Sequence, residues 1–326
     1  MCRVIKGLSK GFFVVFLLSI LFVNNGFCQD KYPERPITIF NPWMGGHAEG
    51  MTRAVCKIVE KEWGQPFVMV GKPGGSGIIG MDAVVKSKPD GYTIGITSIA
   101  VHLINPHVEK PPFNALTDFV DIVGLYRTLY ALSVRADAPW NSYEELIKYA
   151  RENPGKFKYA TTGVSSSQSI CMQRIAAKEG IRWTAVPFKS EGECILSVLG
   201  GNTNAATQSS ISTSDYVKAG KLKLLMILAD KHWPTSPNTP HMLEKGYDFF
   251  AFSYNSIIAP AGLPEPIRAK LEDSFKRALR DPSVIEMASK FQVELVGMGG
   301  KEYSAFWRSK YDEYGEIVKK LEVGGK

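Results

Sequence analysis

The residues with the clearest potential for ligand chemistry lie in a glycine-containing turn, where Gly45, Gly46, His47 and Glu49 follow a short apolar segment. That segment, Ile37 to Phe40, predicts a strand, and the apolar spacing after the turn predicts an amphipathic helix. The first N–H groups of a helix lack intrahelical partners, and the helix dipole places partial positive charge at the same end. The turn can therefore bind an anionic group without a lysine, although it also fits an ordinary strand-to-helix connection.

A second glycine-rich segment, Gly75-Ser76-Gly77-Ile78-Ile79-Gly80, matches the G-x-G-x-x-G pattern of dinucleotide-binding loops. The next predicted strand ends in Thr97-Ser98, whereas a dinucleotide site needs an acidic residue at that point. Lys72 and Pro73 also make the loop longer than the usual tight turn. We therefore expect no dinucleotide, and no other cofactor is indicated.

Motifs for enzymatic chemistry are absent from the sequence. There is no H-E-x-x-H motif, no C-x-x-C pair and no G-x-S-x-G nucleophile elbow. No close metal-ligand spacing is visible among the five histidines, which are His47, His102, His107, His232 and His241. We therefore predict neither a metal site nor catalytic residues.

Composition and the N-terminus indicate an exported globular protein. The 326 residues are 44% hydrophobic and 22% charged, which is an ordinary globular composition and enough chain for two domains. The net charge of +7 includes Arg3, Lys6 and Lys10, and the remaining excess is too small to indicate nucleic-acid binding. Those basic residues precede an apolar run from Gly11 to Val23 that is too short for a membrane anchor. This pattern predicts a cleaved signal peptide over residues 1–28 and an exported mature protein.

The cysteines leave two arrangements open. Cleavage after Cys28 retains Cys56, Cys171 and Cys194, which cannot all pair. Cys56 lies on the apolar face of the first predicted helix and is expected in the core. Cys171 and Cys194 lie near predicted helix starts, and either a disulfide or two buried thiols fits the sequence. A lipoprotein would acylate Cys28, but the preceding residue, Phe27, is a poor match to that processing.

Strands and helices alternate along the mature chain, which predicts α/β architecture with mainly parallel sheets covered on both faces. A strand begins near Leu129, and a later one at Ser256 to Ala259 can return to the first half. Further strands are predicted at 67–70, 92–97, 157–161, 184–188, 204–208 and 222–228. Helices are predicted at 81–87, 142–152, 266–279, 282–291 and 301–321.

The mature chain contains an ordered series of segments, namely YPERPITIFNPWMGGHAEG, VGKPGGSGIIG, PDGYTI, residues 158–170, VPFKSEG, LGGNTNA, VKAGKLKLL and IIAPAGLPEPI. This series resembles the extracytoplasmic solute receptors of tripartite tricarboxylate transporters, also called Bug receptors. The resemblance covers essentially the whole mature chain. It implies a two-lobed, type II-like periplasmic binding protein fold with a ligand cleft between the lobes. Lobe 1 would comprise residues 29–126 and 255–326, and lobe 2 residues 127–254.

The resemblance places the ligand on loops of both lobes. This chain departs from the family pattern at Glu49 and Gln208, each of which stands where relatives have Asp, and at Ser169, where His is frequent. The expected ligand-binding residues are Gly45, Gly46, His47, Glu49, Thr97, Ser98, Thr161, Ser165, Ser166, Ser167, Lys189, Gln208 and Ser209.

The function implied is capture of a small organic acid, without catalysis, and its delivery to the membrane subunits of a transporter by a monomeric receptor. Glu49, Glu191 and Glu193 near the expected loops disfavour a polyanion, so we predict one carboxylate plus a neutral or donor-bearing end. At least one of Glu191 and Glu193 is expected to face solvent. A ligand sensor would share this fold and cleft. An exported enzyme would need a nucleophile with a base, or a metal cluster, in the cleft.

Overall fold

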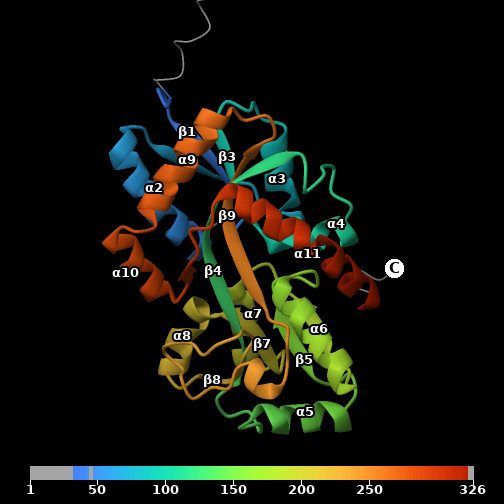
Figure 1. The fold of residues 1–326 in the computed structure, drawn as a ribbon. Coiled ribbons are helices and arrows are strands. Elements are labelled where there is room, and N and C mark those ends of the chain that lie inside the picture. Colours follow the sequence, from blue (N-terminus) through green and yellow to red (C-terminus); the bar gives the residue numbers. More distant parts are fainter. Residues whose placement is uncertain (1–31, 44–46, 322–326) are drawn as a thin grey trace, which may run out of the picture.

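The computed structural model describes residues 32–43 and 47–321, shown as the coloured ribbon in Figure 1. The predicted signal peptide, residues 1–28, lies outside the described residues. None of the described helices combines the length and the apolar character needed to cross a lipid bilayer.

The strands follow one path, in the order β2-β1-β3-β9-β4-β7-β5-β6, and β8 and β10 also pair with β4. The first part of β4 pairs with β9, and its last part pairs with β7 and β8, so β4 belongs to two sheets. We call the part built on β1, β2, β3 and β10 lobe 1, and the part built on β5 to β8 lobe 2; β4 and β9 join them (Figure 1). The strands are β1 (Ile37–Asn41), β2 (Phe67–Gly71), β3 (Thr93–Ser98), β4 (Phe119–Arg135), β5 (Lys158–Thr161), β6 (Thr184–Pro187), β7 (Ala205–Ser209), β8 (Leu222–Ile227), β9 (Phe252–Pro260) and β10 (Glu294–Leu295).

The prediction of mainly parallel sheets holds only for the outer strands. β1 is parallel to β2 and β3, and β5 is parallel to β6 and β7. β4 and β9 are antiparallel to each other and to their neighbours. The reason is that β4 carries the chain from lobe 1 into lobe 2 and β9 carries it back along the same line.

Helices cover both faces of the lobe 1 sheet. In β3, Ile94 and Ile96 pack into the core beneath α2, α9 and α10. Between them Gly95 faces α3, where an added Cβ would lie 2.5 Å from the side chain of Val84. This alternation is the two-residue period of a strand buried on both faces. The bounds are α2 (His47–Trp63), α9 (Glu265–Ala278) and α10 (Pro282–Phe291) on one face, and α3 (Ile78–Val85), α4 (Asn105–Val108) and α11 (Gly300–Lys320) on the other.

Lobe 2 has the same layered construction. Tyr159 and Ala205 pack toward α5 (Tyr143–Glu152) and α6 (Ser167–Glu179). Ala160 and Ala206 pack toward α7 (Glu191–Leu199) and α8 (Ser210–Lys218). Three shorter helical segments complete the fold, the 3₁₀ turns η1 (Gly75–Gly77) and η3 (Leu243–Lys245) and the π-helical η2 (Ala100–Ile104).

The predicted lobe boundaries, at 126/127 and 254/255, fall inside β4 and β9 rather than in loops. They stay predictions, because both strands run through the joining region as one continuous antiparallel pair.

Cys56, Cys171 and Cys194 are all unpaired and buried. Cys56 lies in the lobe 1 core, as predicted. Cys171 and Cys194 pack on opposite faces of the lobe 2 sheet, so the structure contains two buried thiols rather than a disulfide between them.

Candidate ligand-binding site

The carboxyl ends of strands from both lobes face each other at the middle of β4. At the end of β3, Ser98 is opposite Asn255 of β9, which is opposite Tyr126 of β4. At the end of β7, Ser209 is opposite Tyr130 of β4. Tyr126 and Tyr130 are separated by about 13 Å along an extended strand. Because ligands of open α/β sheets bind outside the carboxyl ends of the strands, this gap is the candidate site.

On the lobe 2 side, the Ser-rich turn is ordered by its own hydroxyl groups. Ser166 is the N-cap of α6, and its Oγ accepts a hydrogen bond from the Ser169 N–H at 3.3 Å. The same Oγ lies 3.0 Å from Oγ1 of Thr161, the last residue of β5. Ser165 and Ser167 are buried beside it. The fold thus brings together four predicted site residues at a helix N-terminus, where a carboxylate is favoured. They are Thr161, Ser165, Ser166 and Ser167.

The glycine-rich loop of lobe 1 meets this turn. Ser76 Oγ lies 3.5 Å from Ser165 Oγ, and Asn105 Nδ2 donates to the carbonyl oxygen of Ser76 at 3.2 Å. Gly77 has a φ of +102°, and an added Cβ would lie 2.9 Å from Val101, so glycine is required there. Sequence reasoning rejected a dinucleotide at this loop and gave it no other role. The G-x-G pattern is explained by the close packing of the Gly77 backbone against Val101, beside the candidate site.

At the end of β7, Ser209 is bound to an acidic residue from a neighbouring helix. Its Oγ donates to Glu191 Oε2 at 2.5 Å, and Ser212 also donates to that oxygen. Glu191 is half-buried at the start of α7. It forms no ion pair with any residue in the described part of the chain. Sequence reasoning did not include Glu191 among the site residues.

Glu193 and Lys189 have a different arrangement. Glu193 is exposed, its carboxylate accepts from the Lys189 N–H at 3.0 Å, and its own N–H donates to Ser190 Oγ at 3.2 Å. These reciprocal bonds cap α7 and explain the acidic residue without a ligand. The Lys189 side chain is exposed, and its predicted contact with a ligand stays a prediction.

Several buried polar atoms near the joining strands have no hydrogen-bond partner among the described residues. They are Thr97 Oγ1, Ser256 Oγ and both amide atoms of Gln208. Thr97 is directly opposite Ser256 in the β3–β9 pair, and Gln208 immediately precedes Ser209. A buried unsatisfied polar atom costs about 1–3 kcal/mol, so such atoms call for a ligand or water.

The first-loop residues are only partly described. Gly45 and Gly46 lie outside the described residues, and His47 is described only as the start of α2. Glu49 pairs with Arg53 one turn later, with Arg53 Nε donating to Glu49 Oε1 at 2.8 Å. This i,i+4 pair offsets the negative charge of Glu49, which is one basis of the prediction that the ligand has a single carboxylate.

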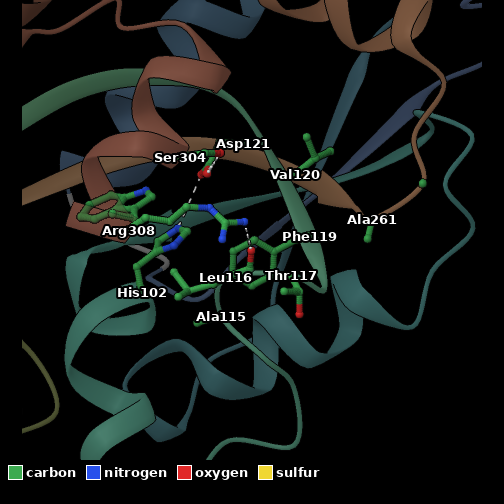
Figure 2. A pocket seen from close by; sticks show the side chains of 12 residues that line it. His102, Ala115, Leu116, Thr117, Phe119, Val120, Asp121, Ala261, Ser304 and Arg308 are labelled. Atoms are coloured by element: carbon green, nitrogen blue, oxygen red, sulfur yellow. Dashed lines mark hydrogen bonds and ion pairs between the residues drawn. The ribbon is translucent and has the colours of Figure 1, made fainter. Parts of the chain in front are cut away.

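A separate pocket of about 340 Å³ lies in lobe 1 and contains no predicted site residue (Figure 2). Within it the His102 ring stacks on Trp307, with centroids 4.5 Å apart, and Ser304 Oγ donates to Asp121 at 2.7 Å. Asp121 Oδ1 lies 3.7 Å from His102 Nε2. Burial lowers the pKa of His102 to about 3 and raises the pKa of Asp121 to about 7. Burial therefore favours the neutral form of each group over a charged pair.

Comparison with known proteins identifies the family and the fold. The profile of the tripartite tricarboxylate transporter family receptors matches residues 51–323. A UPF0065 protein encoded in the gbd 5′ region of Cupriavidus necator is 30% identical over 293 residues, covering 90% of this chain and 89% of the relative.

Solved structures share the fold. The periplasmic binding protein BugD is 26% identical with a TM-score of 0.81, over 90% of this chain and 99% of BugD. An R. palustris protein solved with adipate is 24% identical with a TM-score of 0.83, again over 90% of this chain and 99% of the other. These matches confirm the predicted periplasmic binding protein fold. The chain belongs to the tripartite tricarboxylate transporter family of receptors and is a solute-binding receptor.

Proposed function

We propose that this receptor captures a small organic acid through its carboxylate, between lobe 1 (29–126 and 255–326) and lobe 2 (127–254). It acts as a periplasmic monomer and delivers the acid to the membrane subunits of its transporter. One observation carries the proposal: the carboxyl ends of β3 and β7 face each other across the middle of β4.

The groups at these strand ends suit a carboxylate. Thr161 and Ser166 supply hydroxyl groups at the N-terminus of α6, and Thr97 and Gln208 supply buried polar atoms that lack partners among the described residues. Hydrogen bonds to a charged group contribute about 1.5–3 kcal/mol each, so two or three of them suffice for selective binding. The neighbour solved with adipate supports a carboxylate-bearing ligand, although adipate has two carboxylates.

Binding of this kind couples to lobe closure. Thr97 belongs to lobe 1 and Gln208 to lobe 2, so a ligand that contacts both favours the state in which the lobes are close. The closed state is favoured only by the difference between its affinity and that of the open state. A closed, liganded receptor is the form that a membrane partner would recognise.

The charge of the site refines the ligand. Glu49 is offset by Arg53, whereas Glu191 is held by the hydroxyl groups of Ser209 and Ser212. The carboxylate that a ligand would meet is therefore Glu191. A second ligand carboxylate nearby would be repelled, and a hydroxyl, amide or ammonium group would be attracted. A ligand with one carboxylate and a donor-bearing end fits best.

A matched pair of N-cap serines provides the test. Ser142 and Ser166 cap α5 and α6 in the same way, with Oγ accepting from the N–H three residues later at 3.2 and 3.3 Å. Of the two, Ser166 lies at the candidate site and Ser142 does not. Ser142→Ala and Ser166→Ala should each lower the free energy of unfolding by about 1 kcal/mol. Only Ser166→Ala should also weaken ligand affinity, by about tenfold.

Ligands for this comparison come from a thermal-shift panel of mono-, di- and tricarboxylates, aromatic acids and amino acids. A ligand at 100 times its Kd should stabilise the protein by about 2.7 kcal/mol. Calorimetric titration with the ligand that gives the largest shift then measures the affinity of the Ser142→Ala and Ser166→Ala variants. Equal affinity for the two variants would move the site away from α6, and no shift across the panel would contradict carboxylate binding.

A further inference from the structure

Three metal-ligating side chains converge in the loop that follows β8. His232, His241 and Glu244 each present one ligand atom, and these atoms lie within 4.8 Å of one another. Glu244 Oε1 is 3.2 Å from His232 Nε2 and 3.7 Å from His241 Nε2. The cluster lies in lobe 2, in residues that the ligand proposal does not use.

Backbone groups fix two of the three ligands. His232 Nδ1 lies 2.8 Å from the carbonyl oxygen of Thr239, so Nδ1 carries the proton and Nε2 presents a lone pair. Glu244 Oε2 accepts from the His241 N–H at 3.0 Å, which directs Oε1 toward the two rings. Contacts of this kind orient the ligands of metal sites.

The three facing atoms suit a single cation between them. A lone pair on His232 Nε2 and a carboxylate oxygen of Glu244 repel unless a positive charge lies between them. The same oxygen also faces His241 Nε2. A proton on one Nε2 atom bonds this oxygen to one ring, whereas one metal cation binds all three ligand atoms together.

The two distances from Glu244 to the histidine rings fit a tetrahedral ion. Zn²⁺ binds imidazole nitrogen and carboxylate oxygen at about 2.0–2.2 Å, which places neighbouring ligand atoms about 3.4 Å apart. The two separations that involve Glu244, 3.2 and 3.7 Å, bracket that value, and all three ligand atoms lie within 4.8 Å of one another. Two nitrogens and one oxygen suit Zn²⁺ and similar transition metals rather than Ca²⁺ or Mg²⁺, which take oxygen ligands. His241 is 13% exposed and Glu244 45% exposed, so water can reach the remaining position.

We propose that His232, His241 and Glu244 bind one divalent transition-metal ion of the Zn²⁺ class, with water as the fourth ligand. This revises the sequence-based prediction of no metal site. His232 and His241 are too far apart in sequence to form a familiar motif, and they meet because the loop closes on β8 through the Ile227–His241 bridge.

The ion would also stiffen a loop that contacts lobe 1. Within the same loop, Thr235 Oγ1 donates to Gln292 Oε1 at 2.8 Å, and Gln292 Nε2 donates to Ser214 Oγ at 2.9 Å. Gln292 ends α10 of lobe 1, whereas Thr235 and Ser214 belong to lobe 2. A metal at His232 and His241 therefore stiffens one side of a contact between the lobes.

The test uses mature, untagged protein treated with EDTA and then dialysed. Calorimetric titration with ZnCl₂ should show one equivalent bound and a raised Tm, with no comparable response to CaCl₂ or MgCl₂. His241→Ala and Glu244→Gln should each weaken Zn²⁺ binding by at least about 100-fold. His107→Ala is the matched control, since His107 lies in lobe 1 against Tyr311, and it should bind as the unmodified protein does.

Circular dichroism and Tm without metal establish that each variant is folded, and Glu244→Gln keeps the side-chain shape if His241→Ala does not fold. Absence of Zn²⁺ binding by the unmodified protein would overturn the proposal. So would unchanged binding by a folded Glu244→Gln variant, because the ion would then lie elsewhere. Equal binding of Ca²⁺ would overturn the transition-metal assignment.

Discussion

Asp121→Asn should stabilise the protein increasingly as the pH rises. Asp121 is 5% exposed and lies beside His102, and burial raises its pKa from 3.8 to about 7. At pH above 7 the folded protein must hold a buried carboxylate, whereas the unfolded chain ionises it at no cost. The difference of about 3 pKa units corresponds to on the order of 4 kcal/mol at 1.36 kcal/mol per unit.

The pH window follows from the direction of this shift. Below pH 3.8 Asp121 is protonated in both states, so stability does not change with pH through this group. Between pH 3.8 and about 7 the folded state binds more protons, so the contribution of Asp121 to stability is lost as the pH rises. His102, whose pKa burial lowers from 6.5 to about 3, has the opposite effect, since its contribution is lost as the pH falls below 6.5. The two slopes oppose each other in the unmodified protein, and Asp121→Asn removes one of them.

Urea unfolding at pH 4, 6 and 8 measures the effect, because the difference between variant and unmodified protein cancels the other titrating groups. The gain should be near zero at pH 4 and largest at pH 8. Ser304 Oγ, which donates to the Asp121 carboxylate, can donate equally to the amide oxygen of the substituted side chain, so the packing is retained. Asp215→Asn, at a side chain that is 93% exposed, is the control and should change stability little. A constant difference across the three pH values would show that the Asp121 carboxylate is compensated in the folded protein.

Two further predictions concern the site and the cysteines. Glu191→Gln should improve the affinity for citrate relative to a monocarboxylate, because it removes the negative charge that the hydroxyl groups of Ser209 and Ser212 hold in place. Calorimetry at constant ionic strength measures the ratio of the two affinities. An unchanged ratio would show that Glu191 does not lie near the ligand. Burial raises the pKa of the Cys171 and Cys194 thiols to about 12, so a thiol reagent at pH 8 should label the mature protein only after denaturation. Rapid labelling of the folded protein would contradict their burial.

Most elements of the fold could be predicted from local sequence, because their signals are short-range. Helix 282–291 has its predicted bounds, since Asp281 caps it and Pro282 begins it. The first part of β4 was missed because Asp121 and Arg127 interrupt its apolar pattern. Asp121 is bonded to Ser304, 183 residues away, and Arg127 to Glu294, 167 residues away, so the groups that make these residues compatible with a buried strand are not visible locally.

The same distinction between local and distant partners decides how much of the site was predictable. The Ser-rich turn was found because Thr161 and Ser166 are close in sequence and act on one helix start. Glu49 and Arg53 have the i,i+4 spacing of a helical ion pair, so the sequence could have predicted that Arg53 offsets the charge of Glu49. Glu191 could not have been placed this way, because its partners, Ser209 and Ser212, belong to a different strand and helix. In the proposed site, the charge near the ligand therefore depends on which acidic residues pair with cations of their own helix, as Glu49 does, and which instead accept hydrogen bonds from hydroxyl groups brought by the fold, as Glu191 does.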